Sequence, residues 1–152
     1  MSLYEMIKDI PMFAHFTEED KRGFAQLEHS VLAFKKGEHI IREGGLNTSL
    51  YLLLRGSAEV TKSGYDSPIA VLKAGSVFGE ISFLTSRPRH NNVLARENSL
   101  MIKIDDDLLT KVKPEVRDKI KNHLIELLAE RLDAMNAALS KIAAFARGYA
   151  VL

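Results

Sequence analysis

Glycine divides the middle of this chain into short apolar runs, and this spacing constrains the fold more than any other feature of the sequence. Seven of the nine glycines lie between residues 30 and 104, and the apolar runs between them are only a few residues long. Apolar runs of roughly four to eight residues are typical of β-strands, whereas helices need about 10 to 12. Many short strands that turn at glycine corners predict a sandwich, a roll or a barrel.

The expected strands are defined by apolar residues at alternate or adjacent positions. In chain order these residues are Val31 and Ala33, Ile40 and Ile41, Leu50 to Leu54, Ala58 and Val60, Ile69 and Val71, Val77, Val93 and Ala95, and Leu100, Ile102 and Ile104. Their alternation indicates strands with one face turned toward a core.

Helical patterns flank this glycine-rich span on both sides. Thr17 stands before three acidic residues, as an N-cap stands before a first helical turn. Asp105 begins a second run of acids, and Pro114 occupies a favoured first helical position before a stretch to Lys141 that lacks Gly and Pro. The sequence therefore predicts a mainly β fold with flanking helices.

We expect the 152 residues to form a single domain with a short tail, because one domain of this length buries a sufficient core by itself. The predicted domain covers residues 1–145. It consists of helices over 3–29, strands over 30–104 and C-terminal helices over 105–145, followed by a fraying tail over 146–152.

Apolar residues on the long C-terminal helix recur at spacings of four and three. The series is Leu128, Leu132, Met135, Leu139 and Ile142. One interpretation is the seam of a homodimer formed by two such helices. The other is an amphipathic helix that packs on its own strands, and the sequence leaves both open.

Charge and composition exclude several classes of protein. The sequence has 21 Lys and Arg and 20 Asp and Glu, so its net charge is +1. A charge this small does not attract nucleic acid non-specifically. No apolar run approaches the ~20 residues of a membrane span, and the N-terminus lacks the pattern of a secretory signal. The absence of cysteine excludes disulfides and fits a reducing cytoplasm. We expect a cytoplasmic protein without a DNA or membrane partner.

An enzyme on a jelly-roll barrel needs clustered metal ligands or a nucleophile beside a base. The five histidines show neither His-x-His nor His-x-x-x-His spacing: they are His15, His29, His39, His90 and His123. We therefore expect no catalytic residue and no metal.

One segment, Phe78 to Val93, carries charged residues in an arrangement suited to a sugar phosphate. Gly79 lets the backbone turn after a strand, and Glu80 begins a short helix whose N-terminus attracts anions. The guanidinium of Arg89 can bind a phosphate through paired hydrogen bonds. The Glu80 carboxylate can accept hydrogen bonds from sugar hydroxyls. The alternative is that Glu80 complements the helix dipole and pairs with Arg89.

Ten residues of this segment follow the pattern of a known family. They are Phe78, Gly79, Glu80, Ile81, Ser82, Phe83, Leu84, Pro88, Arg89 and Val93, and the upstream stretches 36–38, 42–44, 53–60 and 72–76 match as well. Together they resemble cyclic nucleotide-binding domains, which occur in catabolite activators, kinase regulatory subunits and gated channels. The resemblance spans about residues 10–140. It implies an eight-stranded β-roll of the double-stranded jelly-roll type, with N-terminal helices and a long C-terminal helix.

The resemblance also implies a ligand, cAMP or cGMP, and a set of contacts to it. Glu80 would accept a hydrogen bond from the ribose 2′-hydroxyl, and Arg89 would pair with the cyclic phosphate. Backbone amides near Ser82 and His90 would complete the anion nest. The expected binding residues are Gly79, Glu80, Ile81, Ser82, Arg89, His90, Asn91, Asn92 and Asn136.

The chain departs from the family pattern at several of these positions. His90, Asn91 and Asn92 replace two small residues and a hydroxyl residue, so they indicate neither cAMP nor cGMP. Met135 and Asn136 replace two hydroxyl residues that contact adenine in catabolite activators; only Asn136 keeps a hydrogen-bonding side chain. The expected function is a regulatory sensor that acts on a protein partner the sequence does not identify. The alternative is a roll that has lost its ligand and serves as a structural or dimerisation module.

Overall fold

The computed structural model describes residues 1–27 and 30–148. The last two residues of the predicted N-terminal helical part, and residues 149–152 of the predicted tail, lie outside the described residues.

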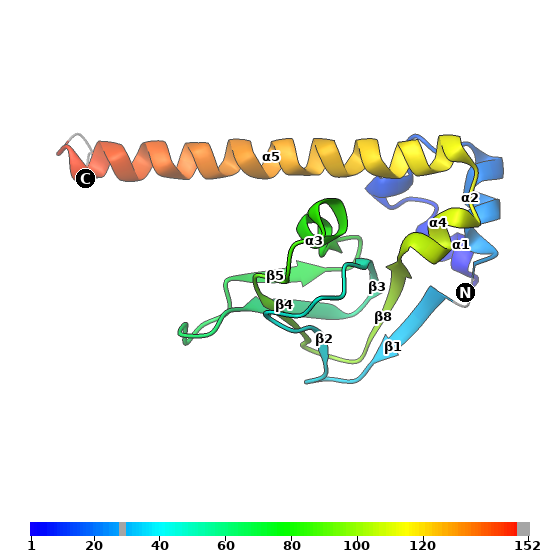
Figure 1. Ribbon diagram of the computed structural model, residues 1–152, viewed down its shortest axis with the longest axis horizontal. Helices are drawn as coiled ribbons and strands as arrows, with labels where there is room; N and C mark the ends of the chain where they lie inside the picture. The colour runs from blue at the N-terminus through cyan, green and yellow to red at the C-terminus, as the bar shows by residue number, and fades with distance from the viewer. Residues whose placement is uncertain (28–29, 149–152) are drawn as a thin grey trace.

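Two antiparallel sheets of four strands form the centre of the molecule (Figure 1). The first has the order β1 (Val31–Phe34), β8 (Ser99–Ile104), β3 (Leu50–Arg55) and β6 (Val77–Phe78), and the second has β2 (His39–Ile41), β7 (Asn92–Ala95), β4 (Ser57–Thr61) and β5 (Ala70–Lys73). These are the eight predicted runs, so the mainly β roll is confirmed.

Helices precede, interrupt and follow the strands. They are α1 (Leu3–Ile7), the 3-10 helix η1 (Pro11–Phe13), α2 (Glu18–Ala25), α3 (Glu80–Thr85), α4 (Asp106–Thr110) and α5 (Pro114–Ala146). Thr17 and Asp20 form a reciprocal capping box at the start of α2. The Asp105 side chain accepts from the Leu108 amide at 2.9 Å and so begins α4.

Strand β3 is buried on both faces, which explains its nearly continuous apolar sequence. Leu50, Leu52 and Leu54 point to one hydrophobic cluster, shared with the flanking helices. Tyr51 and Leu53 point to the other cluster, between the two sheets. The alternation of the strand therefore divides the core into two layers.

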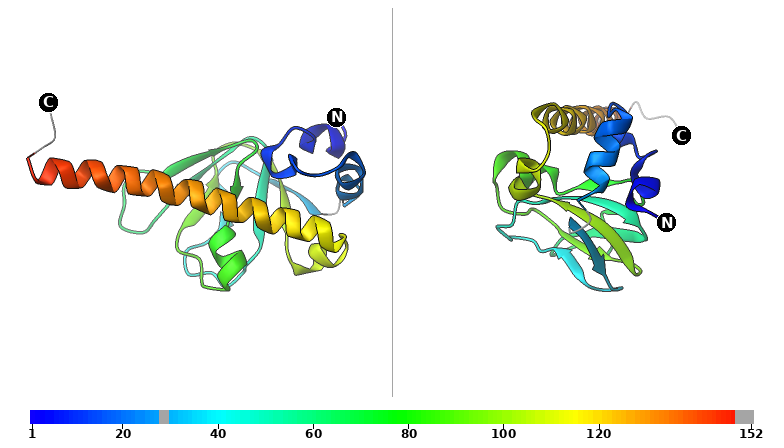
Figure 2. Two further views of the ribbon diagram at one scale, coloured as in Figure 1. Left: turned by 90° about the horizontal axis from the view of Figure 1, so that it is seen from above. Right: turned by 90° about the vertical axis from the view of Figure 1, so that its right-hand side faces the viewer.

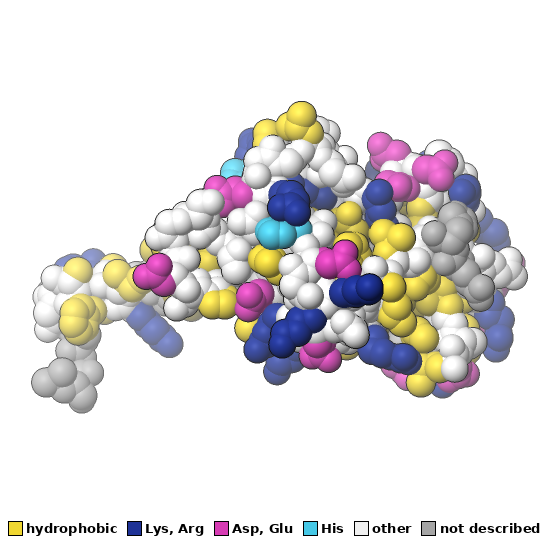
Figure 3. Space-filling model, turned by 90° about the horizontal axis from the view of Figure 1, so that it is seen from below, with side chains coloured by type: hydrophobic (Ala, Val, Ile, Leu, Met, Phe, Trp, Pro, Cys, Tyr) yellow, Lys and Arg dark blue, Asp and Glu magenta, His cyan; other side chains and the backbone are white. Residues whose placement is uncertain are grey.

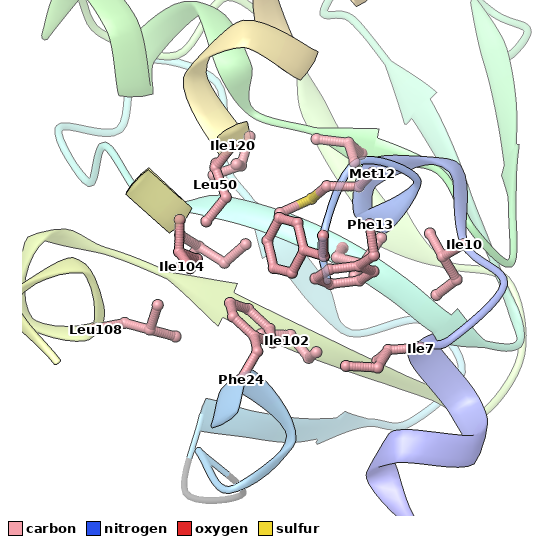
Figure 4. Packing of buried hydrophobic residues seen from close by; sticks show 14 of the residues in the cluster. Ile7, Ile10, Met12, Phe13, Phe24, Leu50, Ile102, Ile104, Leu108 and Ile120 are labelled. Atoms are coloured by element: carbon pink, nitrogen blue, oxygen red, sulfur yellow. The ribbon is translucent and has the colours of Figure 1, made fainter. Parts of the chain in front are cut away.

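The helix-side cluster joins the N-terminal helices, the first sheet and the beginning of α5 (Figure 4). The Phe13 ring packs on the Phe24 ring, with their centroids 5.0 Å apart. Ile102 of β8 and Ile120 of α5 complete the cluster and are essentially inaccessible to solvent. Burial of side chains of this size contributes about 1.5–3 kcal/mol each.

The first part of α5 carries the buried residues by which this helix packs against the described part of the chain. Val116, Ile120 and Leu124 are buried there, and Lys119 Nζ lies 2.8 Å from the carboxylate of Asp20 on α2. The helix then continues past the roll, so that its C-terminal end projects from the molecule (Figures 1 and 2).

The predicted heptad series lies mainly on this projecting part. Leu128 is partly buried, whereas Leu132, Met135, Leu139 and Ile142 are between 57% and 63% exposed. Hydrophobic side chains are visible on the projecting end in Figure 3. For these four residues, the interpretation of a helix packed on its own roll is therefore wrong.

Candidate functional site

A cavity of about 420 Å³ opens beside α3, between the second sheet and α5. Its wall combines an apolar side with a charged side. The lining residues are Ile41, Val60, Ala70, Leu72, Phe78, Gly79, Glu80, Ile81, Ser82, Arg89, His90, Asn91, Val93 and Arg131. Seven of the nine predicted binding residues are among them.

Gly79 makes the turn from β6 into α3 possible. Its φ of 83° lies in the left-handed region, where side chains are disfavoured. A Cβ at this position would stand 3.0 Å from Arg89 Nη1 and 3.0 Å from the Ser49 carbonyl oxygen. Glycine is therefore required both for the backbone conformation and for the close approach of Arg89.

Arg89 is a buried cation in the cavity wall, with 6% of its surface exposed. Its Nη1 donates to the Gly79 carbonyl at 2.9 Å, and its Nη2 donates to the Ser49 carbonyl. No carboxylate in the described part of the chain forms an ion pair with Arg89. Burial lowers the pKa of this guanidinium from its ordinary value, but an arginine still remains charged at neutral pH.

Glu80 also lies in the wall, and its partner comes from the long helix. The Glu80 carboxylate, on a residue only 8% exposed, accepts a hydrogen bond from Arg131 Nη1 of α5. Arg131 Nη2 donates to the Val77 carbonyl at 3.0 Å. The alternative in which Glu80 pairs with Arg89 is wrong, because Glu80 pairs with Arg131 instead.

Arg131 is the charged residue of this cavity that was not predicted from the sequence. It lies 51 positions after Glu80, on a helix that the sequence does not place beside the cavity.

The asparagines that were expected in the site are not all there. His90 and Asn91 line the cavity, and the His90 carbonyl accepts from Lys62 Nζ at 2.8 Å. Asn92 is absent from the lining, because its side chain turns away and accepts from the Glu43 amide at 2.8 Å. Asn136 is exposed on α5, more than one turn beyond Arg131, and does not line the cavity.

Two other structural features are absent from the described residues. Among the described residues, no group of three or more His, Cys, Asp or Glu is placed to hold a metal ion. Within the same residues, no helix is long and apolar enough to cross a membrane. The charged groups of the cavity have complementary chemistry: a buried guanidinium attracts anions such as phosphate, and a neighbouring carboxylate accepts from hydroxyls.

A family model described as "Cyclic nucleotide-binding domain" matches residues 31–113, which is more than half of the chain. The chain is 28% identical over 123 residues to the cAMP-dependent protein kinase regulatory subunit of Yarrowia lipolytica, covering 80% of this chain and 32% of that protein. It is 32% identical over 127 residues to a cGMP-dependent protein kinase of Toxoplasma gondii, covering 83% of this chain and 12% of the kinase.

The fold is also similar to that of a solved cyclic nucleotide-binding domain from Methylobacillus flagellatus. The TM-score is 0.72 at 24% identity, over 91% of this chain and 82% of the other. At this level of identity the likeness supports the fold alone.

Proposed function

Since the chain belongs to the cyclic nucleotide-binding domain family, we propose that it binds cAMP or cGMP in the cavity beside α3 and acts as a non-catalytic regulatory sensor. The matched part of the chain spans about a third of the length of the fungal kinase subunit. The proposal therefore concerns nucleotide binding by this domain and not the activity of the whole kinase subunit.

The observation that carries the proposal is the buried charge of Arg89. A guanidinium removed from water costs several kcal/mol unless an anion compensates it. Two neutral carbonyls hold Arg89 in place but bring no negative charge. A cyclic phosphate carries one negative charge at neutral pH and fits the two-pronged geometry of a guanidinium. We assign the phosphate to Arg89, with Gly79, Ile81, Ser82, His90 and Asn91 around it.

Glu80 is proposed to accept from the ribose 2′-hydroxyl while it also contacts Arg131. Because Arg131 belongs to α5, the ligand and the long helix would share one carboxylate. A ligand that changes this contact changes the position or the freedom of α5, which is a direct route from binding to signal. The side chains of Asn92 and Asn136 take no part in this arrangement of the site.

The exposed series Leu132, Met135, Leu139 and Ile142 supports a homodimer as a second part of the proposal. Four large apolar side chains on one projecting helix are costly in water, and a second copy would cover them. A downstream protein would then read the movement of α5. A cytoplasmic location, with no DNA or membrane partner, is part of the same proposal and rests on the cysteine-free composition and the net charge of +1.

The alternative is a roll that binds no nucleotide. Its support is the Arg131–Glu80 contact, which already satisfies the carboxylate, together with the departures at His90 and Asn91.

Isothermal titration calorimetry with cAMP, cGMP and the non-cyclic control 5′-AMP decides between the two. We expect saturable binding of one or both cyclic nucleotides and much weaker binding of 5′-AMP. Failure of both cyclic nucleotides to bind a folded protein would establish the ligand-free module instead.

A further inference from the structure

A second cavity, of about 260 Å³, lies on another side of Arg89. Arg89 and Ile41 line both this cavity and the one beside α3. The second cavity is bounded by β2 and the loop that follows it, where the backbones of Gly44 and Gly45 pair with the backbone of Arg89. Strand β2 shifts its register between His39 and Ile41, an irregularity that redirects side chains at this edge.

Each polar side chain that lines this second cavity carries a hydrogen-bond donor. They belong to His39, Arg42, Asn47, Tyr51 and Arg89, while the other lining residues are Ile40, Ile41, Gly45 and Leu46. No carboxylate stands among the lining residues, in contrast to the first cavity, which contains Glu80. The Asn47 side-chain oxygen already accepts from the Ser49 amide at 2.8 Å, so its amino group is the part left to bind a ligand.

Tyr51 brings to the wall of the second cavity a hydroxyl that has no partner in the described part of the chain. The residue is 6% exposed and its ring stacks on Phe78, with centroids 5.5 Å apart. Its hydroxyl makes no hydrogen bond within the described residues, yet no fully enclosed side-chain oxygen or nitrogen there lacks a partner. The hydroxyl therefore reaches open space, and the second cavity is the one that Tyr51 lines. Burial raises the pKa of Tyr51, so this hydroxyl stays protonated and can donate.

We propose that the second cavity binds a small oxyanion of the inorganic phosphate class, held by Arg89, Tyr51 and Arg42. Two arginines give the wall a formal charge that an oxyanion neutralises, and charge-assisted hydrogen bonds from arginine and a hydroxyl are the usual means of holding one. Arg89 lines both cavities, so an anion in either one would lie near this buried cation.

The position of Arg89 also gives the site a regulatory consequence, which rests on the proposed function. Two anions beside one guanidinium repel each other, and each weakens the attraction left for the other. Occupation of the second cavity therefore lowers the affinity for the cyclic nucleotide, and by linkage the nucleotide lowers the affinity for phosphate to the same extent.

Calorimetric titration of inorganic phosphate into the nucleotide-free protein tests the site, with sodium chloride at matched ionic strength as the reference. Tyr51→Phe keeps the stacked ring and removes the hydroxyl, and Arg42→Gln removes an exposed charge. Each is expected to weaken phosphate binding about tenfold or more, the effect of losing one hydrogen bond to a charged group. Arg55→Gln is the matched control, because Arg55 is exposed and lines neither cavity.

The outcomes separate this site from the nucleotide site. Phosphate binding that both variants weaken and Arg55→Gln leaves intact supports the second cavity, whether or not a cyclic nucleotide binds. Phosphate binding that neither variant alters would place the ion elsewhere and overturn the proposal. The absence of saturable binding beyond the chloride reference would overturn it as well. If cyclic nucleotides bind, their dissociation constant should rise with phosphate in the wild type and much less in Tyr51→Phe.

Discussion

Replacement of Arg89 by methionine should separate ligand binding from stability. Methionine keeps a long side chain in the wall of the cavity and removes the charge. In the ligand-free protein the guanidinium makes two hydrogen bonds, to Gly79 and Ser49, each worth about 1.5–3 kcal/mol. The opposing contribution is the desolvation cost of the Arg89 cation, which is only 6% exposed and has no carboxylate partner among the described residues. This cost is also several kcal/mol.

These two contributions oppose each other, so Arg89→Met should change the free energy of unfolding by no more than about 2 kcal/mol. Binding has no such compensation. Removing one member of a desolvated charge pair costs about 2–5 kcal/mol, which is a loss of roughly 30-fold to 5000-fold in affinity. The effect on binding should therefore exceed the effect on folding.

Urea unfolding of the ligand-free protein measures the first quantity, and calorimetric titration with cAMP and cGMP measures the second. Arg87→Met is the control, since Arg87 is an exposed arginine in the same loop and lines neither cavity. A folded Arg89→Met protein with wild-type affinity would refute the assignment of the phosphate. A loss of stability well above 2 kcal/mol would refute the opposing-cost argument.

Three further predictions follow from the site and its surroundings. If Glu80 accepts from the ribose, a 2′-deoxy cyclic nucleotide should bind the wild type more weakly than the normal ligand, and this difference should shrink in Glu80→Gln; equal differences in both proteins would contradict the role. Leu132→Asp combined with Leu139→Asp should give a folded monomer by light scattering, whereas a wild type that is already monomeric at high concentration rules out the dimer. Burial lowers the pKa of His123, so the folded state favours the neutral ring. The contribution of His123 to the free energy of unfolding should therefore be at its full value above pH ~6.5 and should be lost as the pH falls through the lowered folded-state pKa. Urea unfolding at several pH values measures this decline, and a decline of the same size in His123→Gln would exclude this histidine as its cause.

Much of the architecture could be predicted because the signals are local. Strand alternation and glycine corners each depend on a few consecutive residues, and they located the eight strands along the chain. The caps at Thr17 and Asp105 depend on a side chain and an amide three positions away, a distance that any helix start reproduces. The turn at Gly79 is equally local, because it depends on one residue with a positive φ, and it sets Glu80 at the start of α3.

The contacts of α5 could not be predicted in this way. Each residue turns a helix by about 100°, so the direction of the axis decides which side chain reaches the cavity. With the axis set by the packing of Ile120 and Leu124, Arg131 meets Glu80, while Asn136 faces solvent. The second cavity likewise appears only when the β2–β3 loop and Arg89 come together across the fold. The sequence by itself determined the strands, the turn and the charged residues of the site; the tertiary structure decided which charges meet, because contacts between distant residues depend on how rigid elements are oriented against a shared core.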